Sequence, residues 1–491
     1  MLDVLIIGAG AVGCAIAREL SRYKLNIAVL EKNSDVAGET TGRNSAVVHA
    51  GFNNKPGSLM AKLCVEGNEG FGSLCEELGV PFDKTGKLIV ALEEEDEESL
   101  EKIISQGKAN GCKGLKIINR DEMRNILPGV DGYKAMYSPQ TGITNPFLYC
   151  VALAENALAN GVSFHLNTCV TGMDRACDGS FLVQAGGRIY QSRLVINCAG
   201  LGGDKICQMV GIKNYKIYPC RGEYFLLDKD KEGLLPLPVY PAPKVGIGGL
   251  GVHLTPTSEG NVIIGPSAEY INETDDYSST AKIMDKLLRE AKQLMPSVER
   301  IKPIGNYCGI RPKLAPPNEG GYRDFVIKEE PACPGFINLM GIESPGLTAS
   351  LPIARMVVEI VKGKLPSIQE NEKFNGRRKA PVQFRKLTRE EQRKLIQEDP
   401  EYGDIVCRCQ KISRREIRDA IENPLGARTI SSIKYRAWPT TGRCNGGYCL
   451  PKIIEMLIND YGMDPSEILY RNEGSEMLTG FVKGGGADEN L

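Results

Sequence analysis

The sequence predicts an α/β domain interleaved with an α+β domain, followed by a small helical domain. Three observations predict this: a strand–loop–helix–strand unit at the start, alternating short strands and helical runs in the middle, and four clustered cysteines near the C-terminus. The chain has 491 residues and a net charge of −1, which suits about three soluble domains and lacks the basic excess of a nucleic-acid binder.

The first domain is indicated by the motif GAGAVG at residues 8–13. An apolar strand (3–7) precedes the motif, and a helix (14–20) and a second strand (27–30) follow it, as in a Rossmann-type dinucleotide-binding unit. Gly8 permits the tight turn, Gly10 lets the backbone approach a pyrophosphate, and Gly13 lets the helix pack on the strand. Glu31, at the end of the second strand, suits ribose hydroxyls and would repel the 2′-phosphate of NADP.

A second glycine motif, GIGGLG at residues 246–251, is followed by a strand (252–256) and not by a helix. We therefore expect a turn or substrate loop there. Further strands are expected at 87–92 and 223–227 and a helix at 145–159, which together predict a mixed sheet covering the nucleotide site.

The motif at 8–13 alone does not separate FAD from NAD, and the loop at 38–51 helps to do so. It is small and polar where an NAD-binding unit usually begins a crossover helix. With RNS at 43–45, HAG at 49–51 and KPGSL at 55–59, it closely resembles the D-amino-acid-oxidase-like FAD superfamily, nearest to its L-2-hydroxyglutarate oxidase and glycerol-3-phosphate dehydrogenase branches.

Two later segments resemble FAD motifs of the same superfamily: LVINCAG at 194–200, and GIESPGLT at 341–348 before a helix at 349–361. The resemblance implies that FAD fills the glycine motif and that the flavin faces a helix N-terminus. The cofactor-binding residues it implies are Gly8, Gly10, Gly13, Glu31, Thr41, Arg43, Asn44, Ser45, Val170, Ala199, Gly200, Gly346, Leu347 and Thr348.

Arg311, in YCGIRPK, resembles the arginine that binds the anionic end of the substrate in this superfamily. A guanidinium group fits phosphate and carboxylate equally, so it leaves both classes open. His49 and His253 are the candidate bases for the substrate hydroxyl, among only 3 histidines in the chain; His165 is expected to be structural. Arg221 and Glu223 are weaker pocket candidates.

One departure from glycerol-3-phosphate dehydrogenases concerns the phosphate. After the histidine–glycine loop those enzymes typically carry Arg and Tyr, whereas this chain has Asn53 and Asn54. The lysine expected in the last FAD motif is also absent. A 2-hydroxy acid such as L-2-hydroxyglutarate therefore remains an alternative substrate.

The C-terminal region contains Cys407, Cys409, Cys444 and Cys449 in a C-x-C…C-x4-C pattern. Thiolates gathered this closely need a cation, either structural zinc or an iron–sulfur cluster. The unit resembles the bacterioferritin-associated-ferredoxin-like [2Fe-2S] domain that is found fused to one subunit of anaerobic glycerol-3-phosphate dehydrogenase. Helices are expected at 413–422, with Ser413 as the N-cap, and at 451–458. The other cysteines are expected to be core residues.

The resemblance implies a flavoprotein dehydrogenase that oxidises glycerol 3-phosphate and passes electrons through the cluster to a second redox subunit, such as an NAD-linked flavoprotein. A non-catalytic electron-transfer subunit is the other alternative. We expect a cytoplasmic protein with no membrane span, any membrane association coming through a partner. The expected domains are an FAD-binding domain (1–75, 150–205, 305–365), a substrate domain (76–149, 206–304), a linker (366–400), a [2Fe-2S] domain (401–462) and a tail (463–491).

Overall fold

The computed structural model describes residues 1–243 and 251–480. The chain forms two compact units, one of Met1–Lys32 with Val36–Ala380 and one of Asn33–Asp35 with Pro381–Leu491. The segment expected to be a linker, 366–400, is thus shared between the two units. The glycine-rich turn expected at 246–251 falls almost wholly outside the described residues.

The nucleotide-binding half of the first unit is built on an eight-stranded sheet. Strand β1 pairs in parallel with β2 on one side and with β12 on the other, and β12 pairs in parallel with β20. The predicted Rossmann-type sheet is confirmed, and β2 has the predicted bounds. Its strands are β1 (Leu2–Ile7), β2 (Ile27–Leu30), β9 (Ser163–His165), β10 (Val170–Arg175), β11 (Phe181–Ala185), β12 (Arg188–Asn197), β19 (Val326–Glu329) and β20 (Phe336–Met340).

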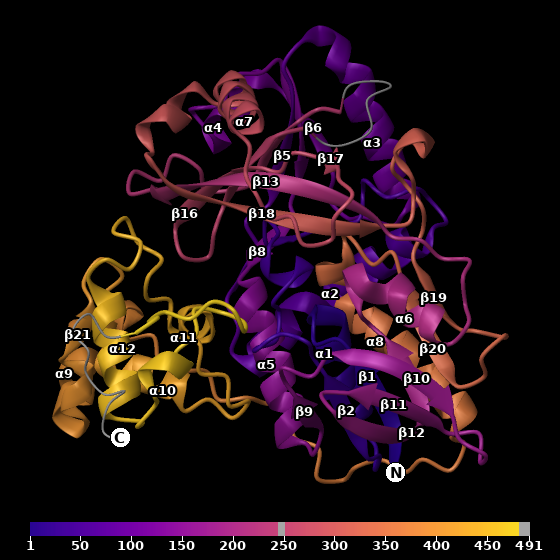
Figure 1. Cartoon of the computed structure of the whole chain (residues 1–491). Coiled ribbons are helices and arrows are strands. Elements are labelled where there is room, and N and C mark those ends of the chain that lie inside the picture. Colours follow the sequence, from indigo (N-terminus) through magenta and orange to yellow (C-terminus); the bar gives the residue numbers. More distant parts are fainter. Residues whose placement is uncertain (244–250, 481–491) are drawn as a thin grey trace. The chain divides into compact units, whose positions relative to one another are not determined.

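The interleaved half contains a nine-stranded sheet, which is mixed as predicted because β5 and β14 pair in parallel among antiparallel neighbours. In Figure 1 helices α4 and α7 lie on one side of this sheet, and β8 and α2 lie on the other. The strands are β5 (Lys87–Ala91), β6 (Lys116–Ile118), β7 (Lys134–Ser138), β13 (Tyr218–Lys229), β14 (Val239–Pro241), β15 (His253–Pro256), β16 (Asn261–Gly265), β17 (Glu269–Tyr270) and β18 (Pro303–Lys313).

Successive side chains along these strands point to opposite sides, so the sheet has two different faces. One face carries an apolar core that includes Leu88, Val239 and Leu254 and packs against α4 and α7. The residues next to them in sequence point the other way, toward the nucleotide-binding half. The remaining elements of the first unit are a small sheet of β3 (Val47–Val48), β4 (Phe82–Asp83) and β8 (Gly142–Thr144), and helices α1 (Ala11–Leu20), α2 (Leu59–Leu78), α3 (Glu97–Ala109), α4 (Arg120–Ile126), α5 (Pro146–Ala159), α6 (Gly203–Met209), α7 (Ala281–Leu294) and α8 (Gly346–Lys364).

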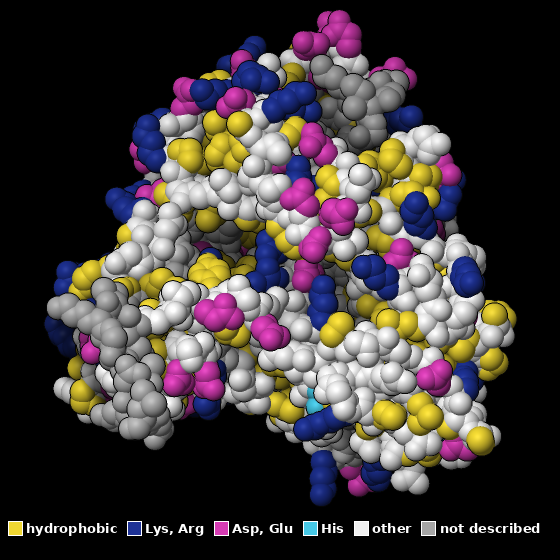
Figure 2. Space-filling model, in the orientation of Figure 1, with side chains coloured by type: hydrophobic (Ala, Val, Ile, Leu, Met, Phe, Trp, Pro, Cys, Tyr) yellow, Lys and Arg dark blue, Asp and Glu magenta, His cyan; other side chains and the backbone are white. Residues whose placement is uncertain are grey.

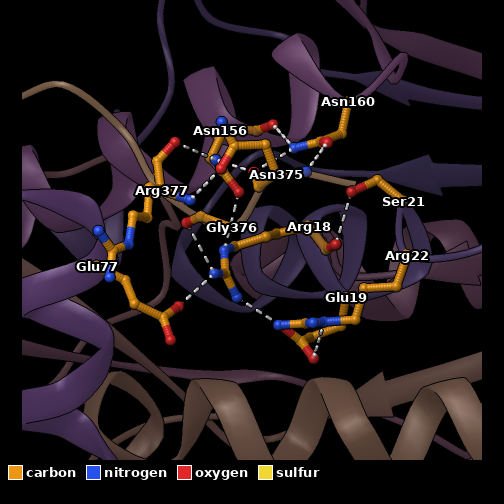
Figure 3. Close-up of polar contacts among 10 residues, drawn as sticks. All are labelled: Arg18, Glu19, Ser21, Arg22, Glu77, Asn156, Asn160, Asn375, Gly376 and Arg377. Carbon is orange, nitrogen blue, oxygen red and sulfur yellow. Dashed lines mark hydrogen bonds and ion pairs between the residues drawn. The ribbon is translucent and has the colours of Figure 1, made fainter. Parts of the chain in front are cut away.

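A buried arginine fastens the end of the first unit to its beginning. Arg18, on α1, donates to Glu19 Oε1 (2.7 Å), Glu77 Oε2 (2.8 Å), Asn156 Oδ1 (3.0 Å) and the carbonyl of Gly376 (3.2 Å). Figure 3 shows these partners surrounding the guanidinium group. The polar segment around residue 376 is therefore held against α1, and Arg18 is satisfied although it is only 1% exposed.

The second unit is a helical domain with one short hairpin and its own apolar core around Ile417, Ile433 and Ile453. Ser413 caps α10 by accepting from the backbone N–H of Glu416, as predicted. Helix α9, within the segment expected to be a linker, has no buried residue. The elements are α9 (Arg389–Glu398), β21 (Ile405–Cys407), β22 (Ile412–Ser413), α10 (Arg414–Ile421), α11 (Ile430–Ala437) and α12 (Cys449–Asn459).

The surface shows no single-signed region on the face drawn in Figure 2, where acidic and basic side chains are intermingled. Across residues 1–243 and 251–480, none of the helices combines the length and apolarity that a membrane crossing requires. The expectation that all remaining cysteines are core residues is wrong for Cys169 and Cys177, which are exposed on loops of the first unit.

Candidate active site

The glycine turn after β1 has no room for a Cβ atom at Gly8 or Gly13. Gly8 has φ +103°, and a Cβ there would lie 2.5 Å from the carbonyl oxygen of Cys198; a Cβ on Gly13 would lie 2.0 Å from that of Gly8. The backbone N–H of Ala9 donates to Glu31 Oε2 at 2.7 Å, which holds the carboxylate beside the turn. This backbone cradle at a helix N-terminus fits the pyrophosphate of a dinucleotide.

The loop at residues 40–45 is held between this turn and β18. Thr41 Oγ1 accepts from the N–H of Ala11 (3.0 Å), next to Gly10, and Asn44 Nδ2 donates to the Thr41 carbonyl (2.7 Å). On the other side, the Tyr307 hydroxyl donates to the Asn44 carbonyl (3.0 Å). The structure therefore brings the predicted cofactor residues of this loop, Thr41 to Ser45, against the glycine motif.

Gly309 explains how closely β18 approaches the same loop. A Cβ on this residue would lie 1.9 Å from the carbonyl oxygen of Arg43, so only glycine fits. Arg43 Nη1 in turn donates to the Cys308 carbonyl at 3.2 Å. Because Arg311 is two residues further along the same strand, its position is fixed relative to the loop.

The start of α8 meets the histidine loop. The backbone N–H of His49 donates to Thr348 Oγ1 (3.0 Å), and His49 Nε2 lies 3.3 Å from Ser344 Oγ. Gly346 and Leu347 form the first turn of α8. A Cβ on Gly67 would lie 2.1 Å from the Thr348 carbonyl oxygen, so α2 packs directly on this helix start.

The remaining predicted cofactor residues lie at the carboxyl edge of the parallel sheet. Ala199 and Gly200 follow β12, and the Ala199 N–H donates to Asn197 Oδ1 (3.2 Å). Val170 begins β10, and two residues earlier the N–H of Thr168 donates to the Glu31 carbonyl (2.7 Å). Ligands of doubly wound sheets bind at this edge.

A single face of the nine-stranded sheet carries the predicted substrate residues. Registers Tyr224↔Tyr307 and Cys220↔Arg311 put Arg311 and both tyrosines on this face, and Tyr240 of β14 stacks on His253 of β15 (centroids 3.7 Å apart). Arg311 donates to the Ser267 carbonyl from both Nη1 and Nη2 (3.3 Å each) and forms no ion pair in the described chain. We call this the substrate face: Lys87, Tyr224, Tyr240, His253, Tyr307 and Arg311.

Burial keeps both candidate bases neutral. Burial, assisted by the nearby Lys87, lowers the pKa of His49 to about 3, and the same causes lower the pKa of His253 well below its ordinary value. Nδ1 of His253 lies 3.3 Å from the Gly251 carbonyl, while Nε2 has no partner among the described residues. A neutral imidazole with a free nitrogen can accept a hydrogen bond from a hydroxyl group.

The weaker candidates lie elsewhere. Arg221 and Glu223 point to the opposite face of β13, where Arg221 pairs with Asp276 Oδ2 (2.6 Å) and Glu223 accepts from Thr280. His165 packs edge-on against Tyr190 (5.2 Å), which agrees with a structural role.

Sequence reasoning missed Lys87, Tyr240 and Ser344. The sequence pattern predicts Lys87 only as the first residue of an apolar strand, yet its side chain is 0% exposed and its Nζ lies 3.6 Å from the centroid of the Tyr240 ring. A lysine continuous with an apolar run, and directly preceded by glycine, is the signal that could have identified it. Tyr240 and Ser344 carry no such local signal.

In the second unit the four predicted thiols lie together. Cys409 Sγ is 3.8 Å from Cys407 Sγ and 3.9 Å from Cys444 Sγ. A hydrogen bond from Cys407 lowers the pKa of Cys449 to about 7. Although burial opposes it, the backbone N–H groups of Gly446 and Tyr448 bring the pKa of Cys444 below its ordinary value.

These contacts favour thiolate ligands. A Cβ on Gly442 would lie 2.3 Å from Cys409 Sγ, so the backbone wraps closely around the thiols. Within the described residues no three histidine, cysteine or carboxylate side chains are already grouped to hold a single metal ion. The four neighbouring thiols and the backbone N–H groups around them nevertheless fit a binuclear cluster, in which the four thiolates are divided between two irons.

Comparison with known proteins assigns a family to each of the two regions. Residues 3–360 match the model of the FAD dependent oxidoreductase family. The chain belongs to this family. Residues 405–459 match the BFD-like [2Fe-2S] binding domain, so the cofactors of this FAD-dependent oxidoreductase are FAD and a [2Fe-2S] cluster.

Relatives of this FAD-dependent oxidoreductase include glycerol 3-phosphate dehydrogenase of Caloramator mitchellensis, 39% identical over 98% of this chain and 99% of that one. Mitochondrial L-2-hydroxyglutarate dehydrogenase of Arabidopsis thaliana is 34% identical over 72% of this chain and 82% of its own length. FAD-bound L-alpha-glycerophosphate oxidase of Mycoplasma pneumoniae superposes with a TM-score of 0.72 and 28% identity, over 78% of this chain and 99% of that one.

Proposed function

We propose that this oxidoreductase oxidises glycerol 3-phosphate to dihydroxyacetone phosphate and passes the electrons through its [2Fe-2S] cluster to a partner subunit. The observation that carries the proposal is Arg311, a partly buried guanidinium without an ion pair in the described chain, on the strand that packs against the loop at 40–45. Support also comes from the Caloramator glycerol 3-phosphate dehydrogenase, which matches this chain through the cysteine domain.

The residues of the substrate face and His49 have separate roles in the proposed oxidation. Arg311 binds the anionic end of the substrate with its free N–H groups, which orients the secondary alcohol. One of the two neutral imidazoles, His49 or His253, accepts the hydroxyl proton as the C–H bond breaks. FAD, when bound, supplies the hydride acceptor. The tyrosines at 224, 240 and 307 exclude water from the face.

L-2-Hydroxyglutarate is the second candidate substrate. The Arabidopsis relative is an L-2-hydroxyglutarate dehydrogenase, and Arg311 fits a carboxylate as well as a phosphate. Asn53 and Asn54, in place of the Arg and Tyr typical of glycerol-3-phosphate dehydrogenases, favour this candidate. A non-catalytic electron-transfer subunit would have no need of the unpaired Arg311.

The deciding experiment is anaerobic titration of the FAD-loaded protein with glycerol 3-phosphate, L-2-hydroxyglutarate and L-lactate, following loss of flavin absorbance at about 450 nm. We expect bleaching by glycerol 3-phosphate. The Arg311→Met variant should retain FAD and lose roughly 1,000-fold in kcat/KM, since a charge-assisted bidentate contact is removed. Bleaching by L-2-hydroxyglutarate alone would replace the proposed substrate, and no bleaching by any of them would refute the dehydrogenase.

The electron path is tested separately with Cys409→Ser and, as a matched control, Cys177→Ser at an exposed cysteine outside the cluster. Cys409→Ser should lose iron and inorganic sulfide and fail to reduce a one-electron acceptor, while glycerol 3-phosphate still bleaches its flavin. Cys177→Ser should behave as wild type. Stoichiometric zinc without iron in the wild-type protein would contradict the proposed path.

A further inference from the structure

The least explained group in the first unit is the ammonium of Lys87. The side chain is 0% exposed, and Nζ has no hydrogen-bond partner among residues 1–243 and 251–480. It forms no ion pair there either, although an ammonium group has three N–H donors to satisfy. Buried lysines are normally paired, because an unpaired buried charge costs free energy. An unpaired one inside a binding face points to a ligand that supplies the missing partner.

The neighbours of Lys87 place it beside the other substrate-face residues. Its Nζ lies 3.6 Å from the centroid of Tyr240, whose ring also stacks on His253 at 3.7 Å and 7°. Two groups this close to one ring occupy its opposite faces. Tyr240, on β14, therefore separates Lys87 on β5 from His253 on β15, in the order in which the strands pair.

The groups around Lys87 offer it no countercharge. Phe52 contributes its ring at 5.0 Å, and Ser138, opposite Lys87 on β7, is neutral. Burial raises the pKa of Cys64 on α2 and of Tyr240, so both remain protonated, and His49 and His253 are neutral. The carboxylate of Glu343, which acts on Arg311, is already paired with Lys313 at 2.8 Å.

We infer that Lys87 is a second substrate-binding cation and that, together with Arg311, it selects a small alcohol carrying two negative charges. A phosphate monoester and a dicarboxylate share this chemistry, whereas a monocarboxylate such as lactate leaves one cation unpaired. The inference rests on the proposed function and narrows its substrate class. The charge of Lys87 can change near neutral pH, because burial lowers its pKa to about 7.

The test uses sulfate, which stays doubly charged between pH 6 and pH 9, as a probe of the FAD-loaded protein, with binding followed by the change in flavin absorbance. Lys87→Met should weaken sulfate binding roughly 10- to 100-fold and raise KM for the dianionic substrate by a similar factor. Lys84→Met, at an exposed lysine three residues away, should change neither. Turnover of L-lactate, if measurable, should not respond to Lys87→Met.

The pH dependence separates a charge contact from a packing effect. Wild-type affinity for sulfate should fall above about pH 7, by up to tenfold per pH unit, as the ammonium loses its proton. In Lys87→Arg affinity should stay high and flat, and in Lys87→Met low and flat. Equal sulfate affinity in wild type and Lys87→Met overturns the inference, and so does a pH dependence that persists in Lys87→Met.

Failure of this inference is distinguishable from failure of the proposed function. If glycerol 3-phosphate bleaches the wild-type flavin while Lys87→Met keeps the wild-type KM and sulfate affinity, the function stands and the role of Lys87 falls. If Lys87→Met lowers kcat alone with KM and sulfate affinity unchanged, Lys87 acts on the proton and not as the second anion-binding cation, which also refutes the inference. FAD content and thermal midpoint of each variant establish that it is folded.

Discussion

Two cations buried to the same degree, Arg18 and Lys87, behave in opposite ways. Arg18 is 1% exposed and has four partners from four parts of the chain, whereas Lys87 is 0% exposed and has none among the described residues. The first arrangement stabilises the fold, because each of the three guanidinium nitrogens donates to a partner. The second costs stability, because an ammonium without a hydrogen-bond partner has lost its hydration. Burial alone therefore does not tell whether a charged side chain stabilises or destabilises the fold; the number of its hydrogen-bond partners does.

The largest expected effect is on stability at Arg18. Arg18→Met leaves the Asn156 amide oxygen and the Gly376 carbonyl without their donor, and it unpairs one oxygen of the buried Glu19. We expect the free energy of unfolding to fall by about 3–5 kcal/mol. Thermal and urea unfolding measure this, with the half-exposed Arg22→Met as the control at less than about 1 kcal/mol. A loss below about 1 kcal/mol at Arg18 would break the comparison.

The next effect has the opposite sign and appears at Lys87. Its folded-state pKa of about 7 lies below the ordinary 10.5, so between these values the unfolded chain binds more protons than the folded one. Wild-type stability should therefore rise with pH across this window by an amount on the order of a few kcal/mol, relative to Lys87→Met. Below pH 7 Lys87→Met should be at least as stable as wild type. A destabilised Lys87→Met would show that the lysine is structural.

The smallest expected effect concerns Glu77, whose side chain is 48% exposed. Glu77→Gln keeps a hydrogen-bond acceptor for Arg18 and removes only a solvent-screened charge, so unfolding should change by less than about 1 kcal/mol. Raising the salt concentration should reduce the difference further. An effect as large as that of Arg18→Met would mean that the charge of Glu77, and not the number of partners, stabilises Arg18.

The sequence predicts those parts of the molecule in which local chemistry is sufficient. The glycine motif, the bounds of β2 and the Ser413 N-cap each depend on a few neighbouring residues. The substrate face is different because it is assembled from five strands, β5, β13, β14, β15 and β18. The order in which these strands pair cannot be predicted from the residues of any one of them. Resemblance to a known family supplied Arg311 and His49, but it offered nothing for Lys87, which only the strand order places beside Tyr240.

The same limit explains the misassigned cysteines. Cys14 and Cys308 lie in apolar runs and are buried, as expected, but Cys169 and Cys177 lie at strand ends, where hydrophobicity averaged along the chain does not indicate exposure. The four clustered cysteines were recognisable because their spacing is itself a chemical pattern. Spacing is thus more informative than residue type.

Strand β18 has one further consequence. Gly309 touches the loop at 40–45 and Arg311 is the proposed anion-binding residue, and about 7 Å of strand separates the two residues. Strand β18 therefore fixes the distance between the cofactor loop at 40–45 and the anion-binding group of Arg311. Relatives that accept longer or shorter substrates would have to change the neighbouring strands, such as β5 and β14, because a residue inserted into β18 would shift both contacts out of register at once.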